Sequence, residues 1–100
     1  MKKKWAMVIM NRLYDPEKDQ RRLDTPDADS YILTVRNSEE AVELAKKLAS
    51  EGFGTIEVCG AFGEELARKM YEATGCKVPV SYVVTPEDQL PAVLRFWGEE

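Results

Sequence analysis

The segment "IEVCGAFGEELARKM", residues 56–70, decides the fold because it joins a strand pattern to a helix pattern through a short turn with two glycines. Ile56 and Val58 alternate with more polar side chains, which is the two-residue period of a strand with one buried face. From Gly63 the apolar residues recur at helical spacing up to about residue 74. The predicted apolar stripe of that helix contains Leu66, Ala67, Met70 and Tyr71.

The same strand and helix order precedes this segment. "SYILTVRN", residues 30–37, alternates like a strand with one wetter face. Asn37 can cap a helix that runs to about Glu51, because Glu40 lies three residues later in the capping-box relation. Gly52 can adopt the left-handed conformation that ends the helix. This unit therefore predicts a second strand followed by a helix.

A third unit follows at residues 77–97. "KVPVSYVV" reads as a strand at the edge of a sheet, because Pro79 removes a backbone hydrogen-bond donor. Thr85-Pro86-Glu87 is typical of a helix start. Pro91 interrupts the helical pattern that follows, so either the helix kinks there or a short turn precedes a helix that begins at Pro91.

The first strand, "KWAMVIM" at residues 4–10, is apolar on both faces and is expected in the middle of a sheet covered on both sides. Together these patterns predict an α/β fold built from βα repeats. We expect one layer of about four mostly parallel strands, covered by three helices. One hundred residues suit a single domain, which we assign to 1–100.

Residues 11–30 form a long connection with ten charged positions. A helix could begin at Asp15-Pro16-Glu17, or residues 22–25 could pair as a short strand beside the second strand. The segment is either a lid over a site or a solvated excursion. A calcium loop counted from Asp15 is excluded, because Pro26 stands where an EF-hand has glutamate. The remaining acidic residues around Pro26 are expected to form turns: Asp24, Asp27 and Asp29.

The composition excludes several classes of chemistry. The chain has no histidine, so it lacks the commonest general base and the commonest metal ligand. We predict no metal and no cofactor, and the sequence leaves open whether the protein is an enzyme. A net charge of −4 argues against a nucleic-acid partner. No apolar stretch is long enough for a membrane span or a signal peptide, so a cytoplasmic protein without a membrane partner is expected.

The turn Cys59, Gly60, Ala61, Phe62 and Gly63 is the candidate binding site. Ligands of parallel α/β folds bind beyond the carboxyl ends of strands, where helix N-termini offer N–H groups to anions. The turn could be structural, could cradle a small anionic ligand, or could hold Cys59 as a reactive thiol. The thiols of Cys59 and Cys76 should both be free, because the intervening helix separates them by roughly 18 Å, too far for a disulfide.

Three further residues could join this site at the same edge: Arg12, Tyr14 and Thr85. Arg12 would pair with an anion, although an exposed salt bridge to the acidic loop is an alternative. Tyr14 could donate a hydrogen bond or stack on a ligand.

The turn "EVCGAFG", with "SEEAVELAKKLASEG" before it and "GCKVPVSYV" after it, resembles a family of small prokaryotic domains of unknown function. Members share a turn of the type Glu-Leu-Cys-Gly-Gly-Phe-Gly and a following Lys-Val-Pro-Val strand. Ala61 replaces the second of those adjacent glycines, which weakens a backbone cradle here. The likeness reaches about Val84, so the last helix is expected to be particular to this protein. The resemblance implies the fold and no activity.

Two functions compete. The first is binding of a small anionic ligand at the Cys59–Gly63 turn. The second is self-association as a homo-oligomer without a small-molecule site, indicated by the adjacent Phe96 and Trp97, which cannot both face one core from one helix. Packing of this pair over the open side of its own sheet is the alternative to a contact surface.

Overall fold

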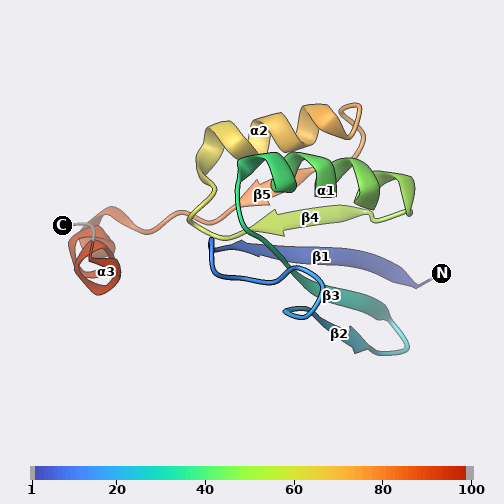
Figure 1. Ribbon diagram of the computed structural model, residues 1–100, viewed down its shortest axis with the longest axis horizontal. Coiled ribbons are helices and arrows are strands. Elements are labelled where there is room, and N and C mark those ends of the chain that lie inside the picture. Colours follow the sequence, from blue (N-terminus) through green and yellow to red (C-terminus); the bar gives the residue numbers. More distant parts are fainter. Residues whose placement is uncertain (1, 99–100) are drawn as a thin grey trace.

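Five strands form one sheet in the order β2-β3-β1-β4-β5 in the computed structural model, which describes residues 2–98 (Figure 1). All neighbouring strands are parallel except β2, which is antiparallel to β3. The elements in chain order are β1 (Lys3–Met10), β2 (Arg21–Asp24), β3 (Ala28–Val35), α1 (Ser38–Ser50), β4 (Thr55–Val58), α2 (Gly63–Ala73), β5 (Val80–Tyr82), the 3-10 turn η1 (Glu87–Gln89) and α3 (Leu90–Trp97).

The α/β class, the mostly parallel sheet and the three helices are confirmed. The predicted number of strands was one too small. The additional strand is β2, so one of the two interpretations proposed for this connection is confirmed, with the pairing at residues 21–24 in place of the predicted 22–25. A helix from Asp15 is wrong, because side chains satisfy the backbone locally: Asp19 Oδ2 accepts from the Asp15 N–H at 2.7 Å, and Asp15 Oδ1 accepts from the Glu17 N–H at 3.1 Å.

An ion pair between Arg22 and Asp29 joins β2 to β3. Arg22 Nε lies 2.5 Å from Asp29 Oδ1, and Arg22 Nη2 lies 2.9 Å from Asp29 Oδ2. These hydrogen bonds from Arg22 hold the pKa of Asp29 below its ordinary value. Asp29, expected as a turn former, therefore pairs across two strands instead.

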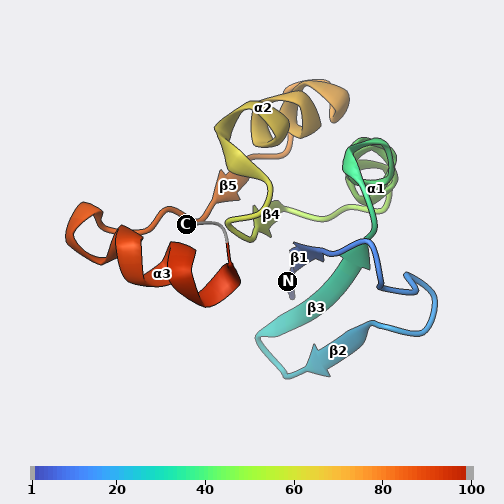
Figure 2. The same ribbon diagram turned by 60° about the vertical axis from the view of Figure 1, so that its left-hand side comes forward.

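Both large helices lie on the same face of the sheet (Figures 1 and 2). The prediction that β1 is covered on both faces is therefore wrong. Ala6 and Val8 face α1 and α2 and are fully buried, whereas the alternate residues of β1 are partly exposed on the other side. We call that other side the open face; its apolar residues, from β1, β2 and β3, are Trp5, Met7, Ile9, Leu23 and Ile32.

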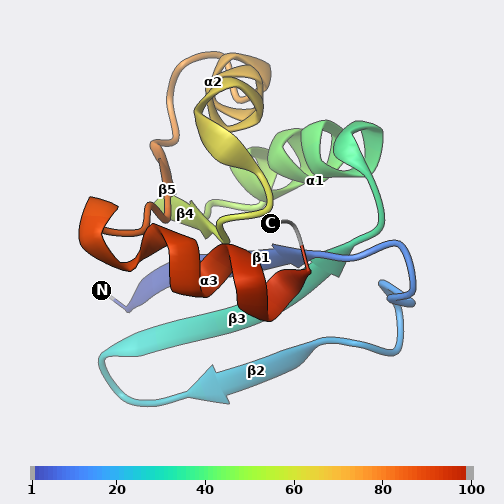
Figure 3. The same cartoon turned by 90° about the vertical axis from the view of Figure 1, so that its left-hand side faces the viewer.

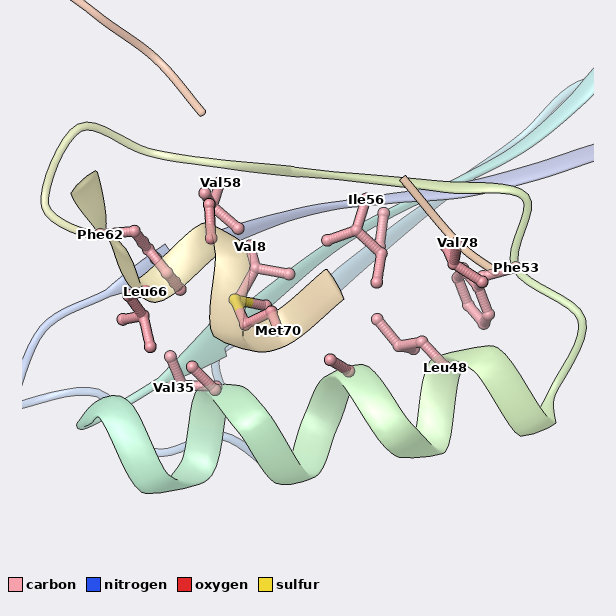
Figure 4. Packing of buried hydrophobic residues seen from close by; sticks show 14 residues of the cluster. Val8, Val35, Leu48, Phe53, Ile56, Val58, Phe62, Leu66, Met70 and Val78 are labelled. Carbon is pink, nitrogen blue, oxygen red and sulfur yellow. The ribbon is translucent and has the colours of Figure 1, made fainter. Parts of the chain in front are cut away.

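The core lies between the sheet and the pair α1 and α2 (Figure 4). Leu48 of α1 and Met70 of α2 meet Ile56 and the two buried valines of β1 and β4, and each of these side chains is at most 2% exposed. Phe53 closes the core near the amino ends of the strands, where its ring centroid lies 5.1 Å from that of Tyr31. In α1 and α2, the apolar residues that recur at helical spacing in the sequence are therefore the ones that face the core.

The start of α1 follows the predicted cap with one change. Asn37 Oδ1 accepts from the Glu40 N–H at 2.9 Å, as expected. In a capping box the Glu40 carboxylate would also accept a hydrogen bond from the Asn37 N–H, and this bond is not formed. It accepts from the Arg36 N–H at 2.8 Å and from the Arg36 guanidinium at 2.6 and 2.9 Å. These bonds, led by those from the Arg36 side chain, hold the pKa of Glu40 below its ordinary value of 4.5.

The last helix begins after a separate short turn, which was one of the two predicted arrangements. Residues 87–89 form η1, and α3 starts at Leu90 with Pro91 in its first turn. The extended segment 83–86 carries α3 beyond the carboxyl edge of the sheet (Figure 1). Phe96 and Trp97 are 78% and 67% exposed, so packing of this pair over the open face of its own sheet is wrong.

Met70→Ala should lower the free energy of unfolding by about 2–5 kcal/mol, because it leaves a cavity where a fully buried side chain meets α1 and the sheet. Urea denaturation measures the change. Leu13→Ala is the matched control, since Leu13 is 77% exposed and its truncation should cost less than about 0.5 kcal/mol. Equal effects of the two substitutions would contradict this core.

Glu40→Gln should destabilise the protein at neutral pH and have less effect in acid. The folded pKa of Glu40 is lowered, so its stabilisation is complete above the ordinary value of 4.5 and is lost as the pH falls through the folded pKa. Urea titrations of both proteins between neutral pH and about pH 3 test this. A difference in stability that stays constant over that range would contradict the role of the charged Arg36–Glu40 pair.

Candidate functional site

The Cys59–Gly63 turn lies at the carboxyl edge of the sheet, where β4 ends and α2 begins (Figure 1). Gly63 has φ +74°, and a Cβ there would meet no atom within 4 Å. A Cβ on Gly60 would lie 3.8 Å from the Val83 carbonyl oxygen, an ordinary contact. The positive φ explains why a glycine stands at position 63, whereas close packing against a neighbour requires a glycine at neither position 60 nor position 63.

Two residues of the turn, Cys59 and Phe62, pack with the hydrophobic core. Cys59 is partly buried and packs against the core, and its N–H donates to the Val8 carbonyl at 3.1 Å. Phe62 is 6% exposed and belongs to the core, and its N–H donates to the Cys59 carbonyl at 3.1 Å. No disulfide joins Cys59 to Cys76 in the part of the chain that is described. A structural role therefore accounts for much of the turn.

A hollow of about 600 Å³ lies beside this turn, between the N-terminal parts of α1 and α2. Ala61 and Phe62 line it, so two of the predicted site residues meet there. Apolar and charged side chains from three elements complete the lining: Met10, Ser38, Glu39, Val42, Glu43, Glu65, Leu66 and Lys69. Its volume falls within the usual range for small-ligand pockets.

The other predicted site residues do not line this hollow. Arg12 is exposed and, within residues 2–98, forms no ion pair, so the alternative of a salt bridge to the acidic loop is not realised. Tyr14 and Thr85 are partly buried elsewhere along the edge. Thr34 Oγ1, whose side chain lies on the open face, donates to the Asp19 carbonyl at 2.8 Å. This bond ties the 11–20 connection to the open face and away from the hollow.

The charges of the hollow are mostly negative. Glu39, Glu43 and Glu65 contribute carboxylates, against the single ammonium group of Lys69. Glu65 Oε1 lies 3.7 Å from Lys69 Nζ, and Glu43 Oε1 lies 3.2 Å from Lys46 Nζ. These carboxylates oppose the binding of an anion. Glu39 and Glu43 were not among the predicted site residues, although their four-residue spacing at the start of a helix places them on one face.

Within residues 2–98, no group of three or more cysteine, aspartate and glutamate residues is arranged to hold a metal ion. No described helix has the length and apolar character needed to cross a membrane.

Comparison with known proteins relates the chain to a protein family. No curated protein and no solved structure is similar to the chain. A family of unknown function, DUF6506, matches residues 3–98. The match confirms the expected relation to a family of unknown function, and it includes α3, so the expectation that the last helix is particular to this protein is wrong. Because nearly the whole chain is matched, the protein belongs to the DUF6506 family.

Proposed function

We propose that this domain is a self-associating module, a homo-oligomer in which α3 supplies the contact surface. The observation that carries the proposal is that α3 is strongly apolar and yet none of its eight residues is buried. An isolated helix of this length is marginal in water, so its stability has to come from packing against another surface.

The exposed apolar surface extends beyond α3. Phe96 and Trp97 pack edge to face with ring centroids 4.9 Å apart, and both remain open to solvent. Leu90 is 40% exposed, and Val83 and Val84 of the preceding segment are 49% and 71% exposed. Exposed large apolar side chains gathered on one helix and the segment before it are typical of a protein interface.

The wild-type protein should have a mass that is a multiple of the 11.4 kDa chain at micromolar concentration. The double variant Phe96→Ser/Trp97→Ser should have the mass of one chain, because it loses the two most exposed aromatic side chains of the surface. Sedimentation velocity over a range of concentrations measures both.

Leu13→Ser is the matched control, since it removes an equally exposed apolar side chain outside this surface and should leave the mass unchanged. A wild-type protein that stays at one chain mass at every concentration would refute the proposal.

The hollow beside Ala61 and Phe62 supports a second candidate function, binding of a small organic ligand at this edge. Its apolar residues suit a small aromatic or aliphatic body. Its excess of carboxylates favours a cationic group on that ligand over the anionic group expected from the sequence.

Benzylamine and benzoate, which share one ring and differ in charge, distinguish the two ligand classes. Millimolar benzylamine should raise the melting temperature more than benzoate does, and Glu43→Gln should reduce the difference because it removes a lining carboxylate. Differential scanning fluorimetry measures these shifts. If only benzoate raised the melting temperature, the ligand would be anionic, as expected from the sequence. If neither compound changed the melting temperature, ligand binding at this hollow would be refuted.

A further inference from the structure

We propose that α3 of each chain packs on the open face of the sheet of a second copy, so that two copies exchange their last helices. This inference rests on the proposed self-association and adds the surface that receives α3. Two unpartnered apolar surfaces of one chain, a sheet face and a helix, thereby cover each other.

The receiving surface is a cluster of apolar side chains at the middle of the sheet, flanked by Arg21 of β2 and Glu57 of β4. Met7 of β1 lies beside Ile32 of β3 in the parallel register, and Trp5 lies beside Ser30 two residues earlier. Ile32 is 37% exposed and Leu23 of the neighbouring β2 is 58% exposed. Trp5 Nε1 donates to Ser30 Oγ at 2.7 Å, so the polar atom of the indole is satisfied within the face and leaves its apolar surface available.

The shape of α3 suits this surface. At about 100° per residue its large apolar residues fall within roughly half of the helix circumference, with Pro91 and Arg95 on the opposite side. Leu90, Val93, Leu94 and Trp97 form the centre of that side, and Phe96, about 100° from Trp97, lies at its edge. A helix with one apolar side packed on a sheet is the same layer arrangement that α1 and α2 make on the other face.

The segment between β5 and α3 leads beyond the carboxyl edge of its own sheet (Figure 1). The Val83 N–H donates to the Val58 carbonyl at 3.1 Å, which extends the β5 pairing by one residue. Pro86 has an extended conformation, φ −55° and ψ 143°, and the chain continues outward beyond the sheet edge. Seen from that edge, α3 lies in front of the strands (Figure 3). Val83 and Val84, exposed here, would be covered where two such segments pass between exchanging copies, an arrangement known from domain-swapped dimers.

The two aromatic side chains of α3 contribute part of the area that a stable dimer needs. Phe96 and Trp97, at their exposed fractions, offer roughly 300 Å² together on each chain. A standard specific interface buries about 1,200–2,000 Å², so the linkers and receiving faces of two exchanged helices have to supply the rest.

Cross-linking tests which surface receives α3. Ile32→Cys and Leu94→Cys are made in separate chains, both with Cys59→Ser and Cys76→Ser, and one chain is labelled with ¹⁵N. The two proteins are unfolded together, refolded and treated with a short bis-maleimide. Mass spectrometry should find a product that joins one labelled chain to one unlabelled chain through these two positions.

Arg68→Cys replaces Ile32→Cys in the matched control, because Arg68 is exposed beside a separate hollow between α2 and β5. This control should give at least tenfold less product. Leu23→Cys provides a second receiving position on the open face if Ile32→Cys prevents folding.

Three results would overturn the exchange. Dominant cross-linking of Leu94→Cys to itself would show that helices pair with helices, and dominant product with Arg68→Cys would place α3 on the other hollow. Cross-linking of a chain carrying both Ile32→Cys and Leu94→Cys within itself would show that α3 closes on its own sheet. In the first two cases an oligomeric wild-type mass would leave the proposed self-association standing, whereas a monomeric mass would refute both proposals.

Discussion

The central position of β1 is the constraint on which the rest of the structure depends. β1 is parallel to β3 on one side and to β4 on the other. The crossovers from β3 to β4 and from β4 to β5 move in the same direction across the sheet, so right-handed connections place α1 and α2 on one face. The connection from β1 to β3 moves the opposite way and would cover the other face, but it contains β2 and a turn in place of a helix. The open face follows from that one connection.

Local signals in the sequence were enough to locate most elements. Asn37 and Gly52 mark the start and end of α1, and Gly63 and Gly75 mark those of α2, because caps and left-handed residues act within a few positions of themselves. The open face was not predictable in the same way. β1 is apolar on both sides, and its sequence does not distinguish burial under a helix of the same chain from burial under another chain.

The candidate site shows the same division between local and non-local information. Ala61 and Phe62 were placed correctly at the carboxyl edge, because the strand, turn and helix are consecutive in the chain. The contribution of α1 to the hollow was missed, since the distance between Glu39 and Glu65 depends on how two helices pack. The 11–30 connection was left open as a lid over a site or a solvated excursion, and the hydrogen bond from Thr34 to Asp19 holds its first part on the side of the sheet opposite the hollow.

The parallel pairing of β1 also sets the order of events during synthesis. Trp5 pairs with Thr55, so the first strand is made long before its second partner. At the usual rates of translation this interval lasts about 2–10 s, during which the most apolar strand of the chain has one neighbour at most. β3 and the hairpin it forms with β2 emerge in between, and they can shield one edge of β1 in the meantime. Pairing with β3 therefore shortens the time during which β1 is an unpaired apolar strand available for aggregation.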